Sequence, residues 1–223
     1  MKGIEYKGLQ SVDGPIVIVR RSEHVFFSEI VYVRDRFGEK RTGRVIDISE
    51  EFAVVQIFGS TNGLDLIETT VEFLETPMEL RVGEGLMGRV FNGLGKPIDG
   101  YEEIISSTKI NVNGYPINPY AREYPRDFIQ TGISSIDGMN TLIRGQKLPI
   151  FSGNGLPHNR LAAQIIRQAR IRSADDDFVM VFAGMGIKYD VAQFFIHTFE
   201  QSGVLSKVVM FQSLADAPSI ERI

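Results

Sequence analysis

The residues best placed to do chemistry lie in one glycine-containing loop, between a short apolar run and an amphipathic stretch. The loop contains, in order, Ser152, Gly153, Asn154, Gly155, Leu156, Pro157, His158 and Asn159. Its length and its position before an expected helix match the phosphate-binding pattern GxxxxGK[ST]. In that pattern, backbone N–H groups and a lysine bind phosphates, and a hydroxyl binds Mg²⁺. The loop is therefore a candidate nucleotide site.

The residues that define this pattern are all different here. Ser152 replaces the first glycine, and Pro157, which has no N–H and a fixed φ, replaces the second. His158, shorter than lysine and mostly neutral at pH 7, stands at the lysine position. Asn159 replaces the hydroxyl and is a poor magnesium ligand. We therefore expect weak or no nucleotide binding at this loop, no catalytic residue and no metal site. The same residues would also be explained by an ordinary strand-to-helix turn in which Pro157 is the first helical residue.

The composition and charge of the chain restrict its class. Of 223 residues, 43% are hydrophobic and 23% are charged, as in globular proteins of one or two domains. A net charge of −4 without a basic run argues against a nucleic-acid partner. Cysteine is absent, and His24, His158 and His197 are too scattered to predict a metal cluster. No apolar run approaches the roughly 20 residues that span a bilayer, and no signal-peptide core begins the chain, so we expect a cytoplasmic location.

Residues 1–75 are expected to form a small antiparallel β-barrel. Short runs rich in β-branched and aromatic residues recur along this part, separated by glycine, asparagine and aspartate. The expected strands cover residues 15–20, 26–34, 42–48, 52–58 and 69–74. This regular spacing is typical of a barrel or a sandwich.

Residues 76–223 change to alternating strands and helices. Continuous apolar runs predict buried strands at residues 148–151, 178–183 and 208–211. Apolar residues at helical spacing predict helices at residues 160–172 and 190–201. This alternation predicts a parallel α/β sheet with right-handed crossovers. In such sheets ligands bind at the carboxyl ends of strands, where the loop begins.

Several stretches of the chain closely resemble the non-catalytic B subunits of V-type and A-type rotary ATPases of the archaeal or bacterial kind. The resemblance spans almost the whole chain, and its most specific part is the degenerate loop, in which Asn154 is a small variation. Ala217 stands where the resemblance leads us to expect an acidic residue. The other matching stretches are residues 88–100, 118–122, 127–138, 144–160 and 213–223.

The resemblance implies an N-terminal β-barrel followed by a phosphate-loop (RecA-like) parallel α/β domain that is C-terminally incomplete. Further strands, a Walker-B-like position, an arginine that reaches a neighbour's nucleotide and a helical domain would follow Ile223. We therefore expect an open sheet edge and uncovered apolar faces. In catalytic relatives a glutamate after the strand that follows the loop helix positions the attacking water. Ile187 stands there and cannot do so.

The resemblance also implies a function. B subunits alternate with catalytic A subunits in a six-membered ring, and they contact central-stalk and peripheral-stalk subunits. ATP synthesis or hydrolysis by the complex is coupled to ion transport. No cofactor is expected to be tightly bound, although ATP or ADP would lie at the interface with the catalytic subunit. The subunit would be peripheral, on the cytoplasmic side of the membrane, and would meet the membrane only through the complex.

Two other readings of the sequence remain open. The first is an active phosphate-loop ATPase with an atypical loop, such as an export-ATPase relative, in which Arg160 or Lys188 would compensate for His158. The second is a free-standing scaffold module without a catalytic partner.

A few further residues carry weaker expectations. The acidic run 175–177 is expected to be a solvated turn, and His24 and His197 are expected at the surface. Three tyrosines near the domain junction are candidates for an interface, namely Tyr115, Tyr120 and Tyr124.

Overall fold

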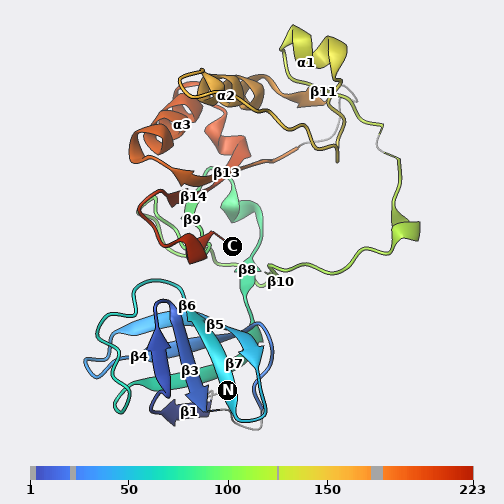
Figure 1. The fold of residues 1–223 in the computed structure, drawn as a ribbon. Coiled ribbons are helices and arrows are strands. Elements are labelled where there is room, and N and C mark those ends of the chain that lie inside the picture. The colour runs from blue at the N-terminus through green and yellow to red at the C-terminus, as the bar shows by residue number, and fades with distance from the viewer. Residues whose placement is uncertain (1–3, 21–23, 125, 172–177, 223) are drawn as a thin grey trace.

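The computed structural model describes residues 4–20, 24–124, 126–171 and 178–222. An all-β part at the N-terminus and an α/β part that holds the C-terminus are joined by a two-stranded ladder (Figure 1). The expected fold class, a small antiparallel barrel followed by a parallel α/β domain, is therefore confirmed. Among the described residues, no helix has the length and apolar character needed to cross a membrane.

The N-terminal part is one seven-stranded sheet in which neighbouring strands run antiparallel. The order β1-β7-β4-β5-β6-β3-β2 makes the two outermost strands consecutive in the chain, so the sheet curls on itself. The expected strand at 26–34 begins only at residue 29, because Ser28 adopts a left-handed φ of 66°. The strands are β1 (Ile4–Lys7), β2 (Ser11–Asp13), β3 (Ile16–Arg20), β4 (Glu29–Arg34), β5 (Lys40–Ile48), β6 (Phe52–Ile57) and β7 (Thr70–Pro77).

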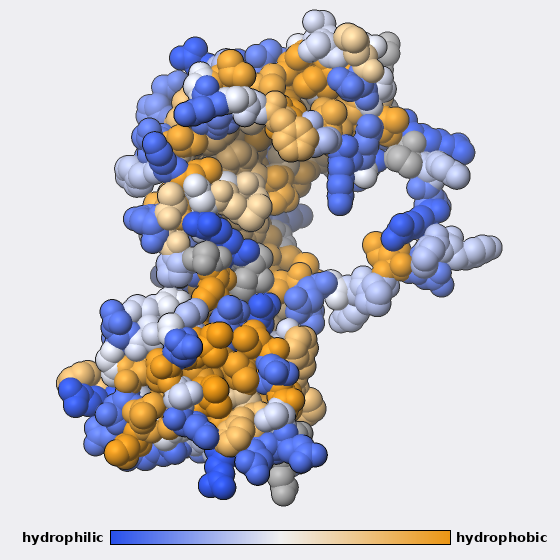
Figure 2. All heavy atoms as spheres, viewed as in Figure 1, coloured by the Kyte–Doolittle hydropathy of each residue, from blue (hydrophilic) through white to orange (hydrophobic). Residues whose placement is uncertain are grey.

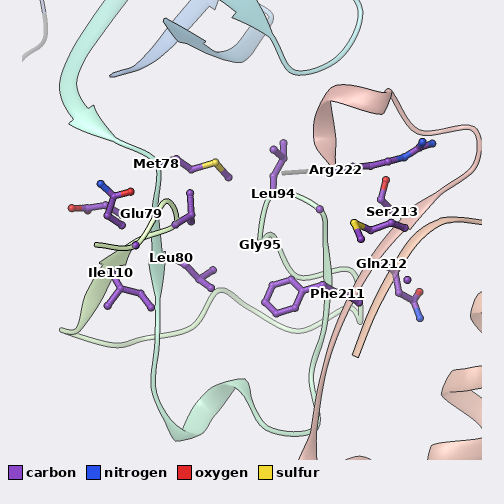
Figure 3. Close-up of a pocket in the computed structure, with 17 residues that line it drawn as sticks. Met78, Glu79, Leu80, Leu94, Gly95, Ile110, Phe211, Gln212, Ser213 and Arg222 are labelled. Carbon is purple, nitrogen blue, oxygen red and sulfur yellow. The ribbon is translucent and has the colours of Figure 1, made fainter. Parts of the chain in front are cut away.

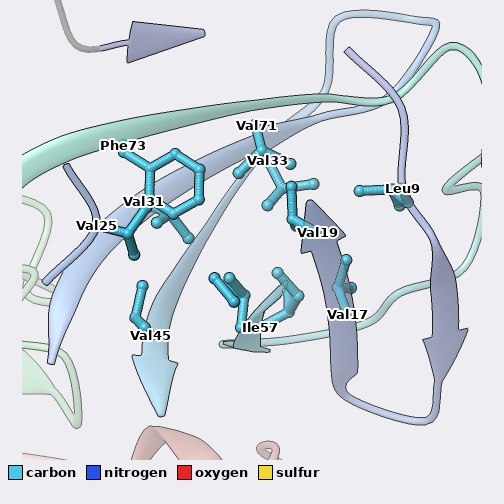
Figure 4. Close-up of a cluster of buried hydrophobic side chains, with 12 residues drawn as sticks. Leu9, Val17, Val19, Val25, Val31, Val33, Val45, Ile57, Val71 and Phe73 are labelled. Carbon is cyan, nitrogen blue, oxygen red and sulfur yellow. The ribbon is translucent and has the colours of Figure 1, made fainter. Parts of the chain in front are cut away.

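Alternation along these strands places one set of side chains inside the barrel. In β6, Ala53, Val55 and Ile57 are buried, whereas the residues between them are only half-buried. Branched side chains pack well against neighbours on a pleated sheet, which explains the many valines. Figure 4 shows side chains from different strands converging on this core, which consists of Leu9, Val17, Val19, Val25, Val31, Val33, Val45, Ala53, Val55, Ile57, Val71 and Phe73.

The α/β part is built on a three-stranded parallel sheet in the order β13-β14-β9. Helix α3 (Tyr189–Gln201) connects β13 (Met180–Ile187) to β14 (Val208–Leu214), and β9 (Val90–Asn92) comes from the chain just after the barrel. The other elements are β8 (Glu79–Arg81), β10 (Lys109–Asn111), β11 (Ile129–Gln130), β12 (Arg170–Ile171), α1 (Ser134–Met139), α2 (His158–Gln168) and 3₁₀ turns at Glu84–Leu86, Pro119–Ala121, Leu205–Lys207 and Ser219–Glu221.

Helices α2 and α3 cover one face of this parallel sheet. Phe195 and Phe199 of α3 meet Phe182 of β13, with ring centroids 4.5 and 5.7 Å apart. Met210 of β14 and Ala163 of α2 belong to the same buried cluster. The expected helical stripe is therefore what attaches α3 to the sheet.

The opposite face of β13 is open to solvent. Val181 and Met185 alternate along the strand and are 67% and 66% exposed. β13 has β14 on one side, and no other described strand pairs with it. This arrangement agrees with the expectation of an open edge and an uncovered apolar face.

Two sequence expectations in the α/β part are wrong. Residues 148–151 form no strand, and Phe151 is 93% exposed. A strand needs a neighbour to satisfy its backbone groups, and no described segment pairs with this one. The helix expected over residues 160–172 ends at Gln168, because Ala169 turns to an extended conformation and Arg170–Ile171 pairs with β11. The acidic run 175–177 lies outside the described residues.

An ion pair stabilises the start of the α/β part. Asp99 accepts bonds from Arg89 Nε at 2.5 Å, Arg89 Nη2 at 3.0 Å and the Val90 N–H at 3.0 Å. Burial opposes the charged carboxylate, but the Arg89 side chain and the N–H groups of Val90 and Tyr101 outweigh it. They lower the pKa of Asp99 from 3.8 to about 2.

We expect Asp99→Asn to destabilise the chain at neutral pH by about 2 kcal/mol. Because folding lowers the pKa of Asp99, its contribution is complete above the unfolded value of 3.8. It is lost as the pH falls through the folded value of about 2. Urea unfolding of both proteins at pH 7 and near pH 2.5 would measure the difference, which should shrink at the lower pH. A difference that stays constant between these pH values would contradict the assignment.

Candidate functional site

The candidate loop is exposed and bends back on itself. The residues from Ser152 to His158 are all exposed, and Gly155 has a left-handed φ of 84°. The His158 N–H donates to the Leu156 carbonyl at 2.9 Å, and the Leu156 N–H donates to the Gly153 carbonyl at 3.4 Å. A phosphate-binding loop must direct such N–H groups at its ligand. Here two of them bond to the loop's own carbonyl oxygens.

Pro157 occupies the position just before helix α2, rather than the first helical position that the sequence suggested. Its φ of −81° and ψ of 46° place it at the N-cap, and no side chain caps the helix. The missing proline N–H removes one donor from the end of the helix where an anion would bind. The helix N-terminus is thus a poorer anion site than its position in the fold suggests.

A small hollow adjoins the loop. Its volume is about 290 Å³, and its lining residues are Leu156, Pro157, Asn159, Arg160, Asp190, Val191 and Phe194. Arg160 is the cation available to a phosphate here, but Asp190 in the first turn of α3 adds a negative charge to the same hollow. A carboxylate beside a phosphate is repulsive, so Asp190 would oppose the attraction between Arg160 and a polyphosphate in this hollow.

Ile187 is the last residue of β13, and Lys188 is the N-cap of α3. The Ile187 carbonyl accepts a bond from the Ala215 N–H at 2.9 Å, which ties the end of β13 to the segment after β14. Neither Ile187 nor Lys188 is among the described residues that line the hollow beside the loop. The apolar Ile187 side chain cannot hold a water by hydrogen bonding.

Sequence reasoning missed a larger pocket, which lies at the carboxyl ends of β13 and β14 (Figure 3). Its volume is about 460 Å³. Gly95 belongs to a tight turn on its wall, with a left-handed φ of 77°, and a Cβ there would lie 2.7 Å from Leu80 Cδ1. The glycine at this turn is the feature of the sequence that could have indicated the pocket. Apolar side chains dominate the lining, including Met78, Leu80, Leu94, Ile110, Val112, Met185 and Phe211.

Two polar atoms near this pocket lack partners. Gln212 Nε2 and Ser213 Oγ are buried and have no hydrogen-bond partner among the described residues. Both residues line the pocket, as does Arg222. Because these two atoms are shielded from solvent, they are not readily offered to a ligand. The pocket suits an apolar group better than a phosphate.

The remaining candidates lie at the surface. His24 and His197 are exposed, as expected, and His197 Nδ1 lies 3.7 Å from a carboxylate oxygen of Glu200. In the described part of the chain, no group of three or more His, Cys, Asp or Glu residues could hold a metal ion. The three candidate interface tyrosines are all strongly exposed, namely Tyr115, Tyr120 and Tyr124.

Comparison with known proteins places both parts of the chain in one family. The family described as "ATP synthase alpha/beta family, beta-barrel domain" matches residues 9–75, and "ATP synthase alpha/beta family, nucleotide-binding domain" matches residues 132–223. The first range covers the barrel from β2 to most of β7, and the second covers the α/β part from α1 onward.

Two curated relatives match almost the entire chain. "V-type ATP synthase beta chain 2" of Treponema pallidum (strain Nichols) is 72% identical over 223 residues, which is 100% of this chain and 46% of that protein. "V-type ATP synthase beta chain" of Halothermothrix orenii is 56% identical over 219 residues, which is 98% of this chain and 47% of that protein. The chain thus spans about half the length of these relatives. It belongs to the ATP synthase alpha/beta family, in which it is closely similar to V-type ATP synthase beta chains.

Proposed function

We propose that this chain is part of a non-catalytic B subunit of a V/A-type rotary ATPase. The observation that supports this most directly is the loop at residues 152–159. It occupies the phosphate-loop position of the sequence but lacks the required lysine and hydroxyl. Its N–H groups at Leu156 and His158 bond to loop carbonyls. A site of this kind can shape a neighbouring pocket, but it supplies no group that would stabilise charge on a transferred phosphoryl group.

In this proposal, chemistry belongs to a catalytic A subunit. The two kinds of subunit alternate in a ring, and further contacts go to the central and peripheral stalks. ATP synthesis or hydrolysis in the ring is coupled to ion transport through a separate membrane sector. The chain binds no cofactor tightly, and ATP or ADP lies at the interface with the catalytic subunit. The complex holds this subunit at the cytoplasmic side of the membrane.

In this proposal the barrel and the α/β part have different roles. The barrel, with its buried valine-rich core, supplies a rigid body for contacts with neighbours. The α/β part presents a helix N-terminus without a lysine, and Asp190 beside it discourages polyphosphate binding. The exposed loop is thus free to contact a neighbouring subunit.

Co-purification with the catalytic A subunit of the same organism tests the proposal. We expect the natural subunit that contains this chain to show no ATP turnover alone. Together with the catalytic A subunit, it should form a stable complex that hydrolyses ATP. His158→Ala in the complex should leave kcat within about twofold, because in this proposal the chemistry belongs to the catalytic subunit. If the isolated subunit turned over ATP and His158→Ala abolished that turnover, the assignment would be refuted and the atypical ATPase would be favoured. A stable monomer without affinity for the catalytic subunit would favour the scaffold.

A further inference from the structure

The end of strand β7 departs from regular pairing with β4. Val31 lies opposite Phe73, whereas Glu29 lies opposite Pro77, so two steps along β4 match four steps along β7. Glu75 lies within this bulge and has a left-handed φ of 56°. Extra residues bend a strand, and this bend comes where the chain passes from β7 to β8, between the barrel and the α/β part (Figure 1).

A buried carboxylate bonds to the backbone of this bulge. Glu29 is 2% exposed; its Oε1 accepts a bond from the Glu75 N–H, and its Oε2 accepts one from the Phe26 N–H at 3.0 Å. The Glu29 N–H in turn donates to the Phe26 carbonyl at 3.3 Å. Ser28, which precedes Glu29, has a left-handed φ of 66°, and its N–H donates to the Val45 carbonyl at 3.0 Å. The Glu29 side chain thus joins two segments that each contain a left-handed residue.

Neither left-handed residue is a glycine, so both conformations need support. A side chain makes such a φ unfavourable, and it persists only where the surrounding bonds hold it. The bond from β5 holds Ser28, and the bond to Glu29 holds Glu75. A carboxylate suits this position because it has two acceptor oxygens and can accept from two N–H groups at once. A glutamine there would have one acceptor oxygen and an NH₂ group that cannot accept.

The α/β part is attached to the barrel directly after this bulge. β7 ends at Pro77 and β8 begins at Glu79, and the Met78 carbonyl between them accepts a bond from the Val112 N–H at 3.0 Å. A hollow of about 510 Å³ is lined from both sides, by Tyr32 of the barrel and Lys96 of the α/β part among others. Because this hollow separates the two parts, their relative orientation depends strongly on the direction in which β7 ends.

We infer that Glu29 is a positioning residue that fixes the direction in which the chain leaves the barrel, and thereby the orientation of the α/β part relative to the barrel. Without the carboxylate, the Glu75 N–H loses its partner and the left-handed φ loses its support. The end of β7 then adopts more than one conformation, and the α/β part more than one orientation. The inference goes beyond the proposed function and involves no partner subunit, so its failure would leave the proposed function unaffected.

The distance between two spin labels tests this in the natural subunit that contains this chain. The chain has no cysteine, so the exposed positions Glu51→Cys in the barrel and Gln193→Cys in α3 place one label on each part, with any cysteine outside the chain replaced by serine. Pulsed EPR is expected to show one narrow distance distribution. Glu29→Gln, which keeps the side-chain size, should broaden it at least about twofold. Glu72→Gln is the matched control, since Glu72 is also on β7 but pairs with Arg34 outside the bulge.

Hydrogen exchange separates positioning from a general loss of stability. In Glu29→Gln, exchange of the Glu75 N–H is expected to rise at least about tenfold, while that of the Val55 N–H in the barrel core stays within about twofold. Equal increases at both sites, or a distance distribution as narrow as that of the control, would overturn the inference. If Glu29→Gln does not fold, Glu29→Asp carries the test, because its shorter side chain cannot reach both N–H groups. It too should broaden the distribution, and an unchanged width would count against the role of Glu29.

Discussion

Magnesium-dependent ATP binding is expected to appear when the candidate loop is rebuilt as Ser152→Gly, Pro157→Gly, His158→Lys and Asn159→Thr together. The unmodified chain is expected to show no binding at nucleotide concentrations of about 1 mM. The lysine adds a charge-assisted bond to phosphate, and the threonine adds a hydroxyl for Mg²⁺. The glycine at position 157 restores an N–H at the loop end of α2. Together these changes should raise the affinity for Mg-ATP at least about 100-fold.

The physical basis is the loop's present hydrogen bonding. With Pro157 at φ −81° and ψ 46°, the His158 N–H bonds to the Leu156 carbonyl instead of facing outward. A glycine allows the chain to turn these groups toward a ligand. Titration calorimetry with and without EDTA measures the gain and its dependence on magnesium.

The matched control changes His158→Lys and Asn159→Thr but keeps Pro157. It should recover only part of the gain, because the backbone donors remain turned inward. Tight Mg-ATP binding by the unmodified chain would show that the loop is functional as it stands. A rebuilt loop without any gain would show that the loop residues are not what prevents binding.

Phe199→Ala is expected to lower the free energy of unfolding of the α/β part by about 3–5 kcal/mol. Phe199 is fully buried in α3, and its ring lies 5.7 Å from that of Phe182 and 5.9 Å from that of Phe195. Removing it leaves a cavity where α3 attaches to the sheet, because the surrounding aromatic rings cannot close the space. Urea unfolding followed by circular dichroism measures the loss.

Phe37→Ala is the matched control for this prediction. Phe37 is 76% exposed in the turn between β4 and β5, where the Arg36 guanidinium lies 4.6 Å from its ring centroid. The same substitution there should change the free energy of unfolding by less than about 1 kcal/mol. Equal effects at the two positions would mean that the α3 cluster does not stabilise the sheet as described.

The sequence by itself determined the features that depend on local pattern or residue type. Runs rich in β-branched and aromatic residues, such as Phe52–Ile57, were enough to predict the barrel strands, because such side chains pack well on a pleated sheet. Apolar spacing likewise predicted α3 nearly to its observed ends. The loss of loop chemistry at Pro157, His158 and Asn159 is also a property of residue type, since no fold gives proline an N–H.

Only the tertiary structure decided the features that depend on distant partners. Residues 148–151 are as apolar as a strand, yet they form none, because a strand exists only where another strand satisfies its N–H and C=O groups. The end of α2 was misplaced for the same reason, since pairing of Arg170–Ile171 with β11 overrides the helical pattern. The apolar pocket likewise arises from segments far apart in the chain, and the spacing of apolar residues carries no record of which segments will meet.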